Sequence, residues 1–293
     1  MPETETLDRL LRERQAERLP SVAAAVVRKG EQVWADAVGA ASYEEDREAT
    51  PGTQYRIGSI TKTFTATAVM QQRDAGALDL DDRLELHLPG IPNGSPTIRR
   101  MLSHLSGMQR EVGEMFVDGT TPTEEDLEPA LALEPHRAHH YSNLAFGLLG
   151  RVVAAKSGMP YTQYVDERII GPLGLERTTW VAQAPRAQGY LVDEYAGTVW
   201  QEPETDLGGV AAMGQLWSTV EDLGRWATFL ASGADGVLDA RTSEQMWFPQ
   251  VMYFPDDWVA AEGRELGERL RIAGDELVWA GYPFTRTQQQ TRA

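Results

Sequence analysis

The chain has 293 residues, 42% of them hydrophobic and 24% charged, a composition typical of a soluble globular protein large enough to bury a substantial core. Its 44 acidic and 27 basic residues give a formal net charge of −17, which disfavours nucleic acids and anionic membrane surfaces as partners. There is no cysteine, so disulfides, thiolate zinc sites and a cysteine nucleophile are excluded.

The first part of the chain predicts a helix followed by a β-hairpin. Leucines recur at helical spacing between residues 3 and 18, and Pro20 ends this pattern. The apolar runs Val22–Val27 and Gln32–Val38 then flank the turn signal Lys29-Gly30-Glu31. The first twenty residues lack the continuous apolar stretch of a secretory signal or membrane anchor, so we predict a cytoplasmic protein.

The segment from Tyr55 to Phe64, YRIGSITKTF, places Ser59 three residues before Lys62 at a glycine-marked junction of loop and helix. On a helix this spacing is about 300° of rotation and a rise of ~4.5 Å, so the two side chains share a face and can meet. The residues after Lys62 are mostly small or apolar, which predicts a buried helix in which a lysine needs a partner or a function. Gly58 permits a sharp turn and close approach of a substrate. We therefore favour a nucleophile with its base over an ordinary helix start.

The region from Ser59 to about Leu230 has helical periodicity. One apolar stripe starts at Ile98 and closes at Ser106-Gly107, and another starts at Leu144 and closes at Gly158. The sequence Ser218-Thr219-Val220-Glu221 is typical of a capping box that opens a further helix. The inner face of this last helix is predicted to carry Leu223, Trp226, Ala227 and Leu230.

A second polar group, Tyr141-Ser142-Asn143, follows Ser59 by 82 residues. From the residues alone, Tyr141 is either a functional phenol or a partly buried aromatic with one hydrogen bond. Asn143 is either a functional amide or a helix N-cap ahead of Leu144.

Two clusters are candidate metal ligands, and we predict that neither binds a metal. They are His136, His139 and His140, and Asp79, Asp81 and Asp82. Pro135 and the approach to Tyr141 predict a surface loop for the histidines, without a carboxylate at a ligand spacing. The aspartates lack the glycine and the closing glutamate of a calcium loop, and we predict a helix N-terminus there. No nucleotide-binding signature occurs, so no cofactor is predicted.

Strands return near the C-terminus, where alternating apolar residues flank the turn signal Gly274-Asp275. Two sheet-forming ends around a helical middle predict an α/β (α+β) fold, in which one antiparallel sheet is built from both chain ends and a helical layer packs beside it. Residues 1–57 and 260–293 would form the sheet part and residues 58–259 the mainly helical part. We expect residues 285–293 to be frayed.

These motifs together resemble the serine beta-lactamase family of the class C and D-Ala-D-Ala carboxypeptidase type, which also contains many esterases. The likeness rests on Ser59-Ile60-Thr61-Lys62, on Tyr141-Ser142-Asn143 and on the phrases around them. Segments similar to the family's sequences, in the same order along the chain, are residues 53–68, 76–83, 98–108, 141–158, 169–175 and 208–230. The resemblance implies a beta-lactamase/transpeptidase-like fold.

The resemblance also implies a role for each residue. Ser59 would be the acylated nucleophile, Lys62 a neutral or proton-sharing amine, and Tyr141 the phenol that passes the proton to the leaving group. Asn143 would bind a substrate carbonyl and brace Lys62. Free lysine and tyrosine titrate at about 10, so neither is a base at neutral pH unless the site shifts its pKa. Burial disfavours the ammonium and a neighbouring ammonium favours the phenolate, so we expect the two groups to titrate as a pair.

The pattern of the family breaks near the C-terminus. Its third element is a strand with histidine or lysine, then threonine or glycine, then glycine, followed by proline-glycine-phenylalanine. Here Val278–Phe284 reads VWAGYPF, and no histidine or lysine follows Gly281, the candidate start of that strand. The strand would supply the oxyanion hole with the second N–H beside that of Ser59, and losing one donor costs about two to three orders of magnitude in turnover. The family's last strands and helix are also missing.

Three explanations for the break stay open: a chain cut short, a change of reading frame near Tyr282, or a divergent protein that has lost catalysis. We favour the first, because the resemblance ends abruptly. The predicted function is a serine hydrolase that acts through an acyl-enzyme on a small ester or amide, with an ester favoured by the cytoplasmic prediction. The alternative is a catalytically silent binding or vestigial protein. The sequence makes no prediction about the oligomeric state.

Overall fold

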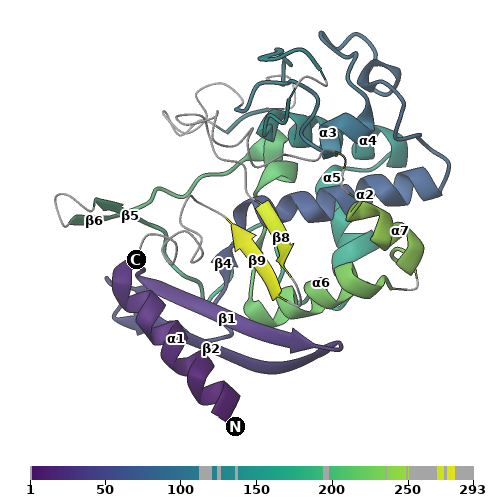
Figure 1. The fold of residues 1–293 in the computed structure, drawn as a ribbon. Coiled ribbons are helices and arrows are strands. Elements are labelled where there is room, and N and C mark those ends of the chain that lie inside the picture. The colour runs from purple at the N-terminus through teal and green to yellow at the C-terminus, as the bar shows by residue number, and fades with distance from the viewer. Residues whose placement is uncertain are drawn as a thin grey trace. The chain divides into compact units, whose positions relative to one another are not determined.

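The computed structural model describes residues 2–111, 121–123, 127–135, 138–193, 198–234, 236–248, 250, 269–273 and 276–280 (Figure 1). By its internal contacts the chain divides into two units, Met1–Phe248 and Pro249–Ala293. The predicted division into a sheet-forming part, residues 1–57 and 260–293, and a mainly helical part, residues 58–259, stays a prediction.

The N-terminal hairpin forms as predicted. Strand β1 (Ser21–Arg28) pairs antiparallel with β2 (Glu31–Ser42), and β3 (Arg47–Glu48) extends the sheet in the order β1-β2-β3. Lys29 and Gly30 both have positive φ, 54° and 81°, which is the geometry of the hairpin turn that matches strand twist. Helix α1 (Pro2–Arg18) packs on this hairpin, where Trp34 Nε1 donates to Asp8 Oδ1 at 2.8 Å (Figure 1).

The rest of the first unit is mostly helical. Its longer helices are α2 (Thr61–Asp74), α4 (Asn143–Ser157) and α6 (Val220–Ser232). Its short helices are α3 (Ile98–Leu102), α5 (Tyr161–Val165) and α7 (Ala240–Met246), with 3₁₀ turns η1 (Gly58–Ile60), η2 (Leu84–Leu86) and η5 (Gly208–Met213) and the π-helical turn η4 (Asp166–Ile170). Its further strands are β4 (Tyr55–Arg56), β5 (Tyr190–Asp193), β6 (Thr198–Gln201) and β7 (Trp217–Ser218), paired β4 with β7 and β5 with β6. Strands β5, β6 and β7 thus lie within the part of the chain that was predicted to be mainly helical.

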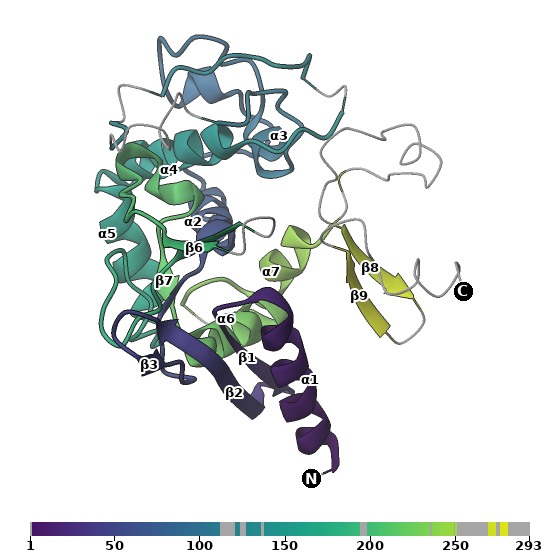
Figure 2. The same ribbon diagram turned by 90° about the vertical axis from the view of Figure 1, so that its left-hand side faces the viewer.

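Helix α2 is the buried helix that the sequence predicts. It contacts α4, α5, α7 and η5, and it lies among these elements in both views (Figure 2). Phe64 on α2 is fully buried and stacks on Trp226 of α6, with ring centroids 3.7 Å apart and planes at 8°. Trp226 Nε1 also donates to Thr63 Oγ1 at 2.9 Å, so the indole has a partner for its only polar group.

Turn η5 lies very close to α4 because α4 carries glycine where the two meet. A Cβ added at Gly150 would lie 2.6 Å from the Cβ of Ala212, and one at Gly147 would lie 2.9 Å from Val210 Cγ1. Both distances are shorter than carbon atoms tolerate, so these glycines set the separation of α4 and η5.

Two predicted helices differ in detail. Helix α6 starts one residue later than the capping box implies, since Thr219 Oγ1 accepts from Asp222 N at 3.3 Å. Its buried face includes Phe229, while Ala227, predicted to face inward, is exposed. The stripe that starts at Ile98 is helical only to Leu102, because His104 adopts φ = 56° and breaks the helix.

The C-terminal unit contains the predicted hairpin. Strand β8 (Arg269–Ala273) pairs antiparallel with β9 (Glu276–Ala280) in a register that places Leu270 opposite Trp279. Within the described ranges this sheet has two strands, so the joining of both chain ends into one sheet stays a prediction. Gly274, Asp275 and residues 281–293, with the predicted third strand and frayed end, lie outside the described residues.

Among the described residues, no helix is both long and apolar enough to cross a bilayer.

The close approach of α4 and η5 can be tested by Gly150→Ala. Although alanine is the better helix former, we expect a loss of about 1–3 kcal/mol in the free energy of unfolding, because the new methyl group overlaps that of Ala212. Urea denaturation measures the change. In an Ala212→Gly background, where the overlapping methyl group is absent, adding Gly150→Ala should lower the free energy of unfolding much less than it does in the wild type. A Gly150→Ala protein as stable as the wild type would contradict the prediction.

Candidate active site

Ser59 lies in the 3₁₀ turn η1, directly before the buried helix α2. Strand β4 pairs with β7, and Ile57 N donates to Leu216 O at 2.9 Å, which fixes the approach to this turn. Gly58 has φ = 49° with open space where a Cβ would lie, so the position requires glycine for its backbone conformation and not for lack of room. Ser59 and Ile60 are exposed, whereas Thr61 and Lys62 are buried.

Lys62 contacts the predicted nucleophile directly. Its Nζ lies 3.1 Å from Ser59 Oγ and 2.6 Å from the backbone oxygen of Met213 on η5. The lysine is only 6% exposed, so these two oxygens replace water around the amine. A neutral amine that donates one hydrogen to a carbonyl still has a lone pair to offer a serine hydroxyl.

Further hydrogen bonds fix the segment that carries Met213 against α2. Thr65 Oγ1 donates to Ala212 O at 2.6 Å, and Leu216 N donates to Thr61 Oγ1 at 3.2 Å. The carbonyl that binds Lys62 is therefore held by contacts on both sides of it.

Tyr141 reaches the same serine oxygen from a distant part of the chain. Its hydroxyl lies 2.8 Å from Ser59 Oγ. The Lys62 amine lies 5.0 Å from the centre of the Tyr141 ring, and the Arg110 guanidinium carbon lies 5.4 Å from it. Cations at this distance are attracted to the ring and stabilise negative charge that develops on the phenol oxygen.

Asn143 is the first residue of α4, so the N-cap position considered for it is wrong. The N-cap is Ser142, whose Oγ accepts from Ala145 N at 3.0 Å. The Asn143 side-chain nitrogen donates to both carboxylate oxygens of Glu111, at 3.0 and 2.9 Å, and Glu111 also accepts from Arg110 Nε at 3.1 Å. The substrate-binding role of Asn143 stays a prediction.

The structure thus brings together the three residues predicted to be catalytic and adds groups that sequence reasoning did not single out. The Met213 carbonyl is a backbone group and carries no sequence signal. Glu111 and Arg110 fall in a stretch without periodicity. The His104 ring stacks on that of Tyr141, with centroids 4.3 Å apart. His104 lies inside a stretch that resembles the family, but the sequence pattern there predicted only a helix.

The local structure around the candidate metal ligands differs from the predicted one. His139 is half-buried and contacts the edge of the His104 ring, whereas a surface position was expected, and His136 lies outside the described residues. The aspartates form a turn closed on itself and not a helix N-terminus, since Asp82 Oδ2 accepts from Asp79 N at 2.8 Å. In the described part of the chain no three of His, Cys, Asp and Glu are grouped to hold a metal.

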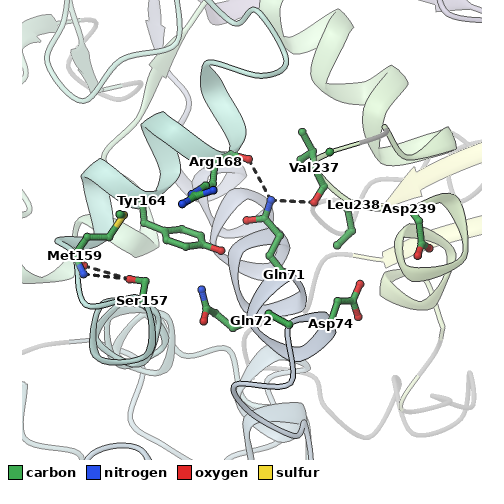
Figure 3. Close-up of a pocket in the computed structure, with 12 residues that line it drawn as sticks. Gln71, Gln72, Asp74, Ser157, Met159, Tyr164, Arg168, Val237, Leu238 and Asp239 are labelled. Carbon is green, nitrogen blue, oxygen red and sulfur yellow. Dashed lines mark hydrogen bonds between the residues drawn. The ribbon is translucent and has the colours of Figure 1, made fainter.

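A cavity of about 480 Å³ lies at the other end of α2 (Figure 3). Gln71 lies at its centre and donates from Nε2 to the backbone oxygens of Arg168 and Val237, at 3.1 and 2.9 Å (Figure 3). Neither Ser59, Lys62 nor Tyr141 lines it, so the cavity is separate from the chemistry described above.

Comparison with known proteins identifies relatives along most of the chain. The family model described as Beta-lactamase matches residues 7–287. "Beta-lactamase-like protein 2" of Dictyostelium discoideum is 31% identical over 79% of this chain and 46% of its own length. "D-alanyl-D-alanine-carboxypeptidase/endopeptidase AmpH" of Escherichia coli strain K12 is 32% identical over 58% of this chain and 47% of its own length.

Among solved structures, D-amino acid amidase of Ochrobactrum anthropi SV3, complexed with L-phenylalanine amide, is 27% identical with a TM-score of 0.70. The match covers 80% of this chain and 71% of that one. The chain spans about half the length of the curated relatives it matches.

The contact between Lys62 and Ser59 predicts that the serine is reactive only while the amine is present. Lys62→Met keeps the length of the side chain and removes the base, so we expect labelling of Ser59 by a fluorophosphonate to slow by about 10²–10⁴-fold. Intact-mass spectrometry measures the rate, and circular dichroism checks the fold. Lys156→Met makes the same change outside this cluster and should label at the wild-type rate; equal labelling of both variants would contradict the prediction.

Proposed function

The chain belongs to the beta-lactamase family of serine hydrolases, and from this premise we propose that it cleaves a small ester or amide through an acyl-enzyme on Ser59. The observation that carries the proposal is the convergence of Lys62 Nζ and Tyr141 Oη on Ser59 Oγ, at 3.1 and 2.8 Å. Relatives named as an amidase and as a carboxypeptidase support the amide among these two substrate classes.

In the first half of the reaction Ser59 Oγ attacks the substrate carbonyl carbon while its proton passes to the Lys62–Tyr141 pair. The carbonyl π electrons move onto the oxygen and form a tetrahedral oxyanion. When the carbonyl re-forms, the bond to the leaving group breaks, and the Tyr141 hydroxyl supplies the proton that the departing oxygen or nitrogen needs. The pair has then returned to its starting protonation state, since it took one proton from Ser59 and gave one to the leaving group.

In the second half, water replaces the leaving group. The pair takes a proton from water, the hydroxide oxygen bonds to the acyl carbon, and the ester bond to Ser59 breaks with return of a proton to Oγ. The products are the free acid and the original enzyme. This reversal uses the same three groups, so one arrangement serves both steps.

The oxyanion requires hydrogen-bond donors, and this requirement separates the two candidate functions. The Ser59 N–H, in the turn before α2, is the first donor that the family resemblance implies. The second donor was predicted from the strand after Ala280, which lies outside the described residues. The rival function, a silent binding protein, draws its support from the absence of histidine or lysine after Gly281 in the sequence.

Intact-mass spectrometry after incubation with p-nitrophenyl acetate and, separately, with benzylpenicillin distinguishes these functions. We expect a single acyl adduct with the wild type, release of p-nitrophenol, and no adduct with Ser59→Ala. Ser232→Ala removes an exposed hydroxyl elsewhere and should form the adduct normally. A folded wild-type protein that forms neither adduct and turns over neither compound would reject the hydrolase and leave the binding protein.

A further inference from the structure

His104 lies directly beside the proposed active site in an unusual backbone conformation. It follows α3 and has φ = 56°, in the left-handed region that residues other than glycine rarely adopt. A histidine held in this conformation requires contacts that compensate for it.

The backbone and the side chain of His104 bind the residues on both sides of Tyr141. His140 N donates to the backbone oxygen of His104 at 2.8 Å, and Ser142 N donates to His104 Nδ1 at 3.2 Å. The backbone amides of the two residues next to Tyr141 thus both bind one residue, 37 positions before Tyr141 in the sequence.

The His104 ring also supports the Tyr141 ring itself. The two rings stack with centroids 4.3 Å apart and planes at 28°. Phe146 of α4 packs against the imidazole at 5.2 Å between centroids, so the imidazole lies among aromatic rings and cannot easily move away.

The protonation state of His104 suits this arrangement. Burial, the largest cause, and repulsion from the charged forms of His139, Lys62 and His140 together lower the pKa of His104 to about 3. The imidazole is therefore neutral at neutral pH. With Nδ1 accepting from Ser142, the ring proton lies on Nε2.

We infer that His104 is a positioning residue that fixes the direction of the Tyr141 side chain and so keeps its hydroxyl on Ser59. The inference rests on the proposed function, in which Tyr141 passes the proton to the leaving group. A tyrosine reaches far from its backbone, so a small rotation of the peptide groups at residues 140–142 moves the hydroxyl away from Ser59. Misplacement by about 1 Å can cost on the order of a hundredfold in rate.

Two substitutions separate the acceptor from the ring. His104→Asn places Oδ1 where Nδ1 was and tolerates the left-handed conformation, but it removes the stacked ring. His104→Phe keeps a stacked ring and removes the acceptor for Ser142 N. In both variants the backbone oxygen that binds His140 N is unchanged, so the His140 amide is an internal control.

The first measurement is amide hydrogen exchange by NMR, which does not depend on activity. In His104→Phe we expect the Ser142 amide to exchange at least about tenfold faster while His140 keeps its protection, and in His104→Asn we expect both to stay protected. Unchanged protection of Ser142 in His104→Phe would overturn the inference. Thermal unfolding of each variant separates local from global loosening.

The second measurement is the rate of acylation by p-nitrophenyl acetate in a double-mutant cycle with Tyr141→Phe. His104→Phe should lower the acylation rate constant about tenfold or more, and more than His104→Asn does, with a smaller effect on binding of the ester. In the Tyr141→Phe background the same substitution should have little further effect. Fully additive losses would mean that His104 does not act through Tyr141 and would overturn the inference.

These outcomes keep the two proposals distinguishable. If Tyr141→Phe acylates as fast as the wild type, the proposed role of Tyr141 fails, and the exchange of the Ser142 amide alone decides whether His104 holds this loop.

Discussion

The hydrogen bond between Lys62 and the carbonyl of Met213 is the interaction on which the rest of the site depends. Lys62 is only 6% exposed, and a buried amine requires acceptors; the Met213 carbonyl, at 2.6 Å, lies closer to it than Ser59 Oγ does, at 3.1 Å. Because a backbone carbonyl accepts but cannot exchange protons at neutral pH, it orients the amine and leaves proton transfer to Ser59 and Tyr141. The chemistry therefore requires η5 to lie where it does.

The position of η5 is in turn a consequence of its packing against α4 and α2. Gly147 and Gly150 on α4 let the turn approach, and hydrogen bonds from the first two turns of α2 attach residues 212–216 to the same helix that carries Lys62. Since α4 begins just after Tyr141, this one helix helps to position both the Met213 carbonyl and the Tyr141 phenol. Residues outside the Ser59, Lys62 and Tyr141 cluster thus help to determine its geometry.

Sequence patterns predicted what depends on local spacing. The N-terminal hairpin, the helix after Ser59, the stripe closed by Gly158 and the contact of Lys62 with Ser59 occur as expected. The contact of Tyr141 with Ser59 joins distant parts of the chain and was expected from the family resemblance. Partners that arise from backbone atoms or from irregular loops were missed, because the Met213 carbonyl has no residue type to recognise and Glu111 has no periodic neighbours. His104 was missed for another reason, since the helix predicted through it ends at Leu102 and its left-handed conformation depends on contacts with residues 140 and 142.

The boundary between exposure and burial falls inside the motif, between Ile60 and Thr61. The buried amine of Lys62 lies on the inner side of that line, whereas Ile60, 43% exposed and adjacent to the nucleophile, lies on the outer side. Replacing an outer residue costs little in folding stability, because it forfeits little buried area. A fold divided in this way can acquire new substrate preferences one surface substitution at a time while its proton-transfer groups stay unaltered.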